Sequence, residues 1–154
     1  MTINHKLILL ISGIFAVASA PAIAQDSADD EAEVILTIER QWAAEQSGDK
    51  EWPDRLLVDK FSGWPNNAPA PRSKASTKLW DRFNDSQGKT IEHELYFQNI
   101  VIHGDVAIAH YLYTNAYQDK EKKKAEVNNG RYTDILVRTD DGWKFIAWHG
   151  GDDQ

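Results

Sequence analysis

The chain of 154 residues contains no cysteine, and this absence excludes disulfide bonds and thiol chemistry. Its five histidines form neither an H-x-x-x-H nor an H-E-x-x-H pattern, so we expect no metal site. The sequence also lacks a glycine-rich phosphate loop, a dinucleotide fingerprint and a nucleophile elbow, so we expect no cofactor. Stability must come from packing, for which six Trp, five Tyr and five Phe supply large apolar surfaces.

The sequence also lacks an apolar run long enough to span a bilayer, because the apolar stretch after Lys6 ends at Ala18. Basic residues before this stretch and an A-x-A site ending at Ala24 are typical of a cleavable signal peptide. The segment 1–24 is therefore predicted to be a signal peptide, and no cysteine follows it to carry a lipid anchor. We expect a periplasmic or secreted protein with no membrane attachment after cleavage.

The sequence has fewer basic than acidic residues. Its 17 Lys and Arg and 24 Asp and Glu give a formal net charge of −7. Loss of Lys6 with the signal would make the mature charge about −8. Such a charge repels phosphate backbones, so nucleic acid is not an expected partner. The remaining 130 residues, 25–154, have room for one domain with one hydrophobic core.

The first half of the mature chain has helical periodicity. A helix is predicted over 30–47, a short helix over 49–57, and a third helix after the N-cap Ser73, ending at Gly88. Ala75, Leu79 and Phe83 are predicted to form the buried stripe of the third helix. Residues 58–72 contain several Pro, Gly and Asn residues and are predicted to be a loop with Trp64 in its middle.

The second half alternates in the manner of β-strands and contains two tight turns. Strands are predicted over 91–102, 106–117, 126–138 and 143–149. The turn Gly104–Asp105 joins the first two, and the sequence Thr-Asp-Asp-Gly joins the last two. The sequence therefore predicts three helices followed by an antiparallel meander.

The motifs Gly104-Asp105-Val106-Ala107 and Asp141-Gly142-Trp143, the latter followed by His149, carry a resemblance to a known family. With the helices before them, they resemble the nuclear transport factor 2-like superfamily, including its SnoaL-like and ketosteroid-isomerase-like members and the association domain of calmodulin-dependent kinase. The resemblance implies an α+β fold, a cone-shaped, cystatin-like roll in which three N-terminal helices pack on a strongly curved antiparallel sheet. It also implies a deep pocket and a homodimer formed through the sheet.

Two strand residues are the candidates for chemistry. The turn at residues 139–142 is predicted to place Asp134 on the same face as His149. A carboxylate beside an imidazole gives a general acid or base that works near neutral pH. The alternative is that His149 ends the last strand and Asp134 is a structural partner.

Five aromatic residues are the candidates for ligand binding. The resemblance implies that Tyr111 and Tyr113 face the pocket. Trp42, Trp64 and Trp80 are predicted to meet at its open end, with Trp64 on a loop that closes over it. Core packing is the alternative for Trp42 and Trp80.

Two functions remain open from the sequence. One is an exported protein that binds an unidentified small, apolar molecule and carries out cofactor-free acid/base chemistry of the isomerase or dehydratase type. The other is a dimeric association module without a reaction. A fold of this kind hosts many activities, so the choice depends on the pocket.

Overall fold

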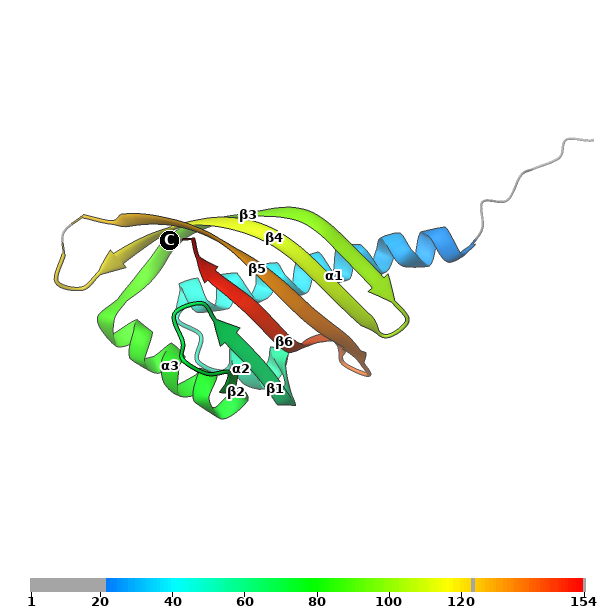
Figure 1. Ribbon diagram of the computed structural model, residues 1–154, viewed down its shortest axis with the longest axis horizontal. Helices are drawn as coiled ribbons and strands as arrows, with labels where there is room; N and C mark the ends of the chain where they lie inside the picture. Colours follow the sequence, from blue (N-terminus) through cyan, green and yellow to red (C-terminus); the bar gives the residue numbers. More distant parts are fainter. Residues whose placement is uncertain (1–21, 123, 154) are drawn as a thin grey trace, which may run out of the picture.

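The computed structural model describes residues 22–122 and 124–153, which form an α+β fold with three helices and a six-stranded sheet (Figure 1). The predicted signal segment lies outside the described residues except for its last three, which belong to the first helix. None of the helices in the described part of the chain is long and apolar enough to cross a membrane.

Two strands lie between the second and the third helix in the order of the elements along the chain. The elements are α1 (Ala22–Ser47), α2 (Trp52–Leu56), β1 (Leu57–Pro65), β2 (Arg72–Ser73), α3 (Lys74–Gln87), β3 (Gly88–His103), β4 (Val106–Asp119), β5 (Glu126–Thr139) and β6 (Gly142–Asp152). The three helices of the prediction exist, but β1 and β2 separate the second from the third.

The sheet is mixed, with the strand order β2-β1-β6-β5-β4-β3. The strands β3 to β6 form the predicted antiparallel meander, and their two-residue turns lie between His103 and Val106 and between Thr139 and Gly142. Gly104 and Gly142 have φ values of 57° and 97°, which L side chains rarely adopt. Figure 1 shows β3, β4 and β5 curving over α1, and two register shifts in β3 accompany this bend.

The prediction of a loop over 58–72 is wrong for its first half, because residues 57–65 form β1. This strand pairs parallel with β6, with Gly63 opposite Trp148. A Cβ atom on Gly63 would lie 2.4 Å from Trp148 Nε1, so the glycine is what lets the indole approach the strand. The sheet is therefore not purely antiparallel.

The core lies between α1 and the concave face of the sheet. Val34, Ile38 and Trp42 of α1 are buried there, as the helical period predicts. They pack in one cluster with apolar side chains of the sheet, among them Leu136 and Phe145. The helices thus leave the convex face of the sheet open to solvent, and we call it the outer face. Large apolar side chains are exposed on it: Tyr96, Val101, Val106 and Leu112.

Candidate functional site

An open cavity of about 600 Å³ lies between α3 and the concave face of the sheet, beyond the end of the apolar core. Residues from α1, α3 and the strands β3 to β6 line it, together with the segment 65–67 and Arg72. Most of this lining is polar. We call this space the α3 cavity.

The helix α3 supplies one wall with its polar side chains. Thr77, Asp81, Asn84 and Asp85 line the α3 cavity at helical spacing, and Thr77 is only 7% exposed. Its N-terminus is capped as predicted, with the Ser73 side chain accepting a hydrogen bond from the Ser76 N–H.

The predicted buried stripe of α3 is wrong. Leu79 and Phe83 are 66% and 53% exposed, and Ala75 is also exposed. The helix has the amphipathic pattern that the sequence shows, but it is turned so that the polar side meets the cavity. A polar cavity wall, and not the apolar core, determines its orientation.

Three polar atoms of the cavity wall are buried without a hydrogen-bond partner in the described structure: Thr77 Oγ1, Asp81 Oδ2 and Asn115 Oδ1. Asp81 Oδ2 is compensated by an ion pair with Lys50 at 3.2 Å, which leaves Thr77 Oγ1 and Asn115 Oδ1 without any partner. Buried polar groups are hydrogen-bonded in the great majority of cases, because an unpaired group costs about 1–3 kcal/mol. These atoms point to a binding partner that the protein itself does not supply.

Glu45 of α1 brings an acid to the cavity. Glu45 is an exposed residue whose side chain lines the α3 cavity. Desolvation by the surrounding protein and the negative charge of Asp81 raise the pKa of Glu45 to about 7, whereas a hydrogen bond with Gln41 and the charge of Lys50 act in the opposite direction. Glu45 therefore exchanges its proton near neutral pH.

Asp134 on β5 is outside the lining of the α3 cavity and is 1% exposed. Burial raises its pKa to about 7; a hydrogen bond with the Tyr111 hydroxyl opposes that rise, and the charge of Glu45 adds to it. Tyr111 in turn accepts a hydrogen bond from Trp42 Nε1 at 3.1 Å. Trp42, Tyr111 and Asp134 thus form a buried polar chain that no sequence pattern indicates.

The structure does not bring Asp134 and His149 together, so the prediction of a shared face is wrong. Asp134 pairs with Trp148, and His149 pairs with Thr133. A register shift between Ile135 and Leu136 gives β6 one extra residue, which reverses the side to which the following residues point. The Asp134 side chain is consequently buried, and His149 is exposed on the outer face.

The predicted aromatic residues fall into three groups. Tyr113 and Trp80 line the α3 cavity, and the Tyr113 hydroxyl donates a 2.6 Å hydrogen bond to Asp152 Oδ1. Trp42 and Tyr111 are buried in the core behind it.

The loop prediction placed Trp64 over the cavity, and this is wrong. Trp64 lies on β1, 46% exposed, with its ring 6.2 Å from that of His149 and its Nε1 donating to the carbonyl of Ala68. Trp148, which sequence reasoning did not single out, lines the cavity in its place.

Arg72 of β2 also lines the α3 cavity, with its guanidinium 4.1 Å from the centre of the Trp80 ring. Burial lowers its pKa. A cation over an indole face is an attractive electrostatic contact, and it holds Arg72 against the wall.

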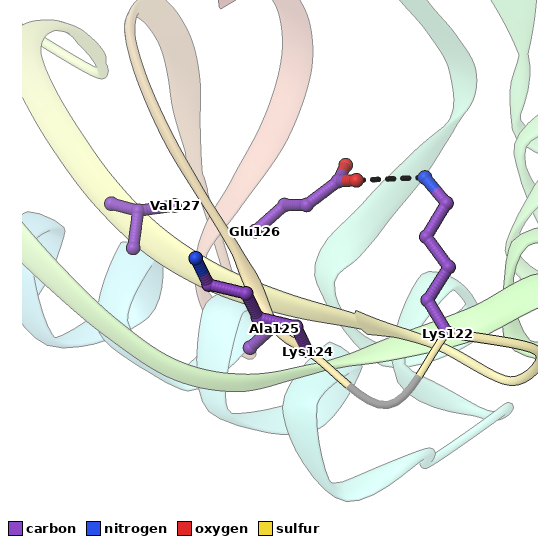
Figure 2. A pocket seen from close by; sticks show the side chains of 5 residues that line it. All are labelled: Lys122, Lys124, Ala125, Glu126 and Val127. Carbon is purple, nitrogen blue, oxygen red and sulfur yellow. Dashed lines mark hydrogen bonds and ion pairs between the residues drawn. The ribbon is translucent and has the colours of Figure 1, made fainter.

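A second hollow lies beside the β4–β5 hairpin and is lined by residues 122 and 124–127 (Figure 2). Lys122 Nζ and Glu126 Oε1 form a 2.7 Å ion pair there, and both side chains are more than half exposed. An exposed pair of this kind contributes little, and the described lining has no buried polar atom without a partner. The α3 cavity is therefore the candidate site.

A long helix held against a curved mixed sheet, with a cavity between the sheet and a further helix, is the architecture of the nuclear transport factor 2-like class. Residues 30–152 match the family model of the calcium/calmodulin dependent protein kinase II association domain, and the chain belongs to that family.

Solved structures with the same fold come from several bacteria. A conserved protein from Planctomyces limnophilus has a TM-score of 0.74 at 17% identity, over 81% of this chain and 98% of that one. An NTF2-like protein of unknown function in nutrient uptake from Rhodospirillum rubrum has a TM-score of 0.66 at 22% identity, over 79% and 98%.

A ketosteroid isomerase-like protein from Erwinia carotovora has a TM-score of 0.66 at 12% identity, over 80% of this chain and 93% of that one. At these identities the likeness establishes the fold alone. A search of curated proteins gave no match.

Proposed function

We propose that this protein binds a small polar molecule in the α3 cavity. The observation that carries the proposal is the pair of buried, unpartnered atoms in its wall, Thr77 Oγ1 and Asn115 Oδ1. A bound molecule that hydrogen-bonds to them removes the cost of leaving them unpaired. The polar lining favours a polar ligand over the apolar one that the sequence suggested.

The volume of about 600 Å³ lies in the range of cavities that hold small molecules. Glu45, with a pKa of about 7, is suited to exchange a proton with a bound molecule near neutral pH. The buried Asp134 interacts electrostatically with Glu45, so the ionisation of the two carboxyl groups is coupled. His149, on the outer face, has no part in this proposal.

Native mass spectrometry of the protein purified from its own host tests the proposal. We expect a retained molecule in the wild type and its loss from Thr77→Val, which removes the hydroxyl and keeps the shape of the side chain. Ser76→Ala changes the neighbouring residue of α3, which does not line the cavity, and should retain the molecule. Equal retention by Thr77→Val and the wild type would contradict the proposal.

A second candidate function, association of two copies through the outer face of the sheet, is favoured by the large apolar side chains exposed there. Tyr96 and Leu112 are cross-strand partners on this face and are 46% and 43% exposed. Exposed apolar surface of this kind is a common mark of protein interfaces. Sedimentation of the wild type and of Leu112→Arg tests the candidate: a dimer that the substitution converts to a monomer supports it, and a monomeric wild type contradicts it.

We also propose that the protein is exported with removal of residues 1–24, on the strength of the signal-like pattern at its N-terminus. N-terminal sequencing of the protein from the periplasm or the medium is expected to begin at Gln25. A chain that starts at Met1 and remains in the cytoplasm would contradict export.

A further inference from the structure

The charged groups of the α3 cavity are mostly acidic. Four carboxyl groups line it, from α1, α3 and the end of β6: Glu45, Asp81, Asp85 and Asp152. The cationic side chains of the lining are Arg72 and Lys89. Lys50 lies outside the lining and pairs with Asp81 at 3.2 Å and with Asp85 at 3.1 Å.

The same negative charges raise the pKa values of two tyrosines in the wall. Burial raises the pKa of Tyr132 first, and the charges of Glu45, Asp134 and Asp152 raise it further. Burial likewise raises the pKa of Tyr113, as do its hydrogen bond to Asp152 and the charge of that residue. Acids from α1, β5 and β6 therefore act on one space, where positive charge is stabilised.

The walls are also rich in aromatic rings. The side chains that supply them are Trp80, Tyr113, Tyr117, Tyr132 and Trp148. Ring faces attract cations, and sites that combine such faces with carboxylates are suited to organic ammonium groups. The guanidinium of Arg72 over Trp80 is an example of this contact within the cavity itself.

The unpartnered Asn115 Oδ1 adds a requirement, because a carbonyl oxygen can only accept a hydrogen bond. An ammonium group that still carries N–H bonds can donate to it. A quaternary ammonium group or a carboxylate cannot.

Resting on the proposed function, we infer that the ligand of the α3 cavity is a small organic amine, bound as its ammonium cation. Glu45 and Asp152 provide the negative charge, the aromatic walls surround the apolar part of the ligand, and Asn115 Oδ1 accepts a hydrogen bond from the ammonium group. The ligand class is thus set by charge and by the direction of hydrogen bonding.

The affinity should depend on pH through Glu45. The groups that act on this carboxyl group are Asp81 from α3, Gln41 from α1 and Lys50 before α2. The charge of Glu45 in turn raises the pKa of Asp134 and of Tyr132 on β5. With a pKa of about 7, Glu45 is largely protonated at pH 6 and largely ionised at pH 8. A cation binds the ionised form more tightly, so the affinity should rise from pH 6 to pH 8.

Calorimetric titration with three probes of one shape tests the inference: benzylamine, which is a cation at these pH values, benzyl alcohol and benzoate. We expect benzylamine to bind at least tenfold more tightly than either counterpart at pH 8. Glu45→Gln and Asp152→Asn should each weaken benzylamine binding about tenfold, and Glu45→Gln should also abolish the change between pH 6 and pH 8. Asp140→Asn removes the same charge from the exposed β5–β6 turn and should leave binding unchanged.

Preferential binding of benzoate or benzyl alcohol would overturn the amine inference, as would benzylamine binding that Glu45→Gln and Asp140→Asn weaken equally. Loss of benzoate binding in Arg72→Ala would identify the arginine as an anion site instead. These results leave the proposed function intact, since the cavity would still hold a polar molecule. The proposed function fails separately, through equal retention of the native ligand by Thr77→Val.

Discussion

The carboxyl group of Asp134 on β5 is buried within electrostatic reach of Glu45 on α1, and the negative charge of Glu45 raises its pKa beyond the effect of burial alone. Both groups have a pKa of about 7. Glu45 lines the α3 cavity, whereas Asp134 is buried and does not line it. Ionisation of the acid in the cavity is therefore coupled to a buried acid of the sheet.

Asp134 should make the stability of the protein depend on pH. The unfolded chain loses this proton near the ordinary value of 3.8, whereas the folded chain holds it to about 7. The contribution of Asp134 to the free energy of unfolding is greatest below pH 3.8. It decreases as the pH rises toward 7 and is lost above that. The loss has an upper limit of about 4 kcal/mol, at about 1.4 kcal/mol per pKa unit.

Urea unfolding of the wild type and Asp134→Asn between pH 4.5 and pH 8 measures this dependence. The difference in unfolding free energy between the two should shift in favour of the variant as the pH rises. Asp140→Asn, on the exposed turn, serves as the control and should follow the wild type. A constant difference between the wild type and Asp134→Asn would show that Asp134 is ionised in the fold.

Trp42→Phe should destabilise the protein by about 1–3 kcal/mol, because it removes the N–H that donates to the buried Tyr111 hydroxyl and leaves a gap in the core. Trp64→Phe is the matched change on an indole that is 46% exposed, and it should cost less than about 1 kcal/mol. Thermal unfolding of both variants compares the two. Equal losses would contradict the assignment of Trp42 to the core and Trp64 to the surface.

Gly63→Ala should cost about 1–3 kcal/mol, because its Cβ would lie 2.4 Å from Trp148 Nε1 and 2.7 Å from the Phe61 ring. Trp148 lines the cavity, so its emission spectrum should shift as well. Ser62→Ala alters the adjacent, exposed residue of β1 and should change neither quantity. Equal stability of Gly63→Ala and Ser62→Ala would contradict the close approach of Trp148 to β1 at Gly63.

Trp64→Ala should leave benzylamine affinity unchanged, since Trp64 lies on the outer side of β1 and its Nε1 bonds to Ala68. Trp80→Ala should weaken the affinity, because Trp80 lines the α3 cavity. Calorimetry of the two variants makes a direct comparison. A larger loss for Trp64→Ala would restore the view that this residue covers the ligand.

Much of the sheet could be predicted from the sequence, because the strands β3 to β6 pair with neighbours in the chain through short turns. The pattern around Gly104 and Gly142 is enough to fix both hairpins. The strand β1 could not be found in this way, since its parallel partner β6 lies far along the chain. Gly63 and Pro65 instead gave its residues the composition of a loop.

The site was harder to predict, because it depends on which way side chains point. One extra residue on β6 separates Asp134 from His149, and the sequence around Ile146 carries no signal for such a bulge. The spacing of Leu79 and Phe83 correctly predicts an amphipathic helix. It does not tell whether the apolar side of that helix faces the core or the solvent. The cavity, which decides this, is formed by elements distant in sequence.

Mapping amide and indole resonances during titration with a mixture of small amines, alcohols and carboxylates tests the α3 cavity as the ligand site most directly. The account predicts shifts at the indole N–H groups of Trp80 and Trp148 and at the side-chain amide of Asn115. Shifts confined to residues 124–127 beside the β4–β5 hairpin, or to Trp64 and His149 on the outer face, would contradict it.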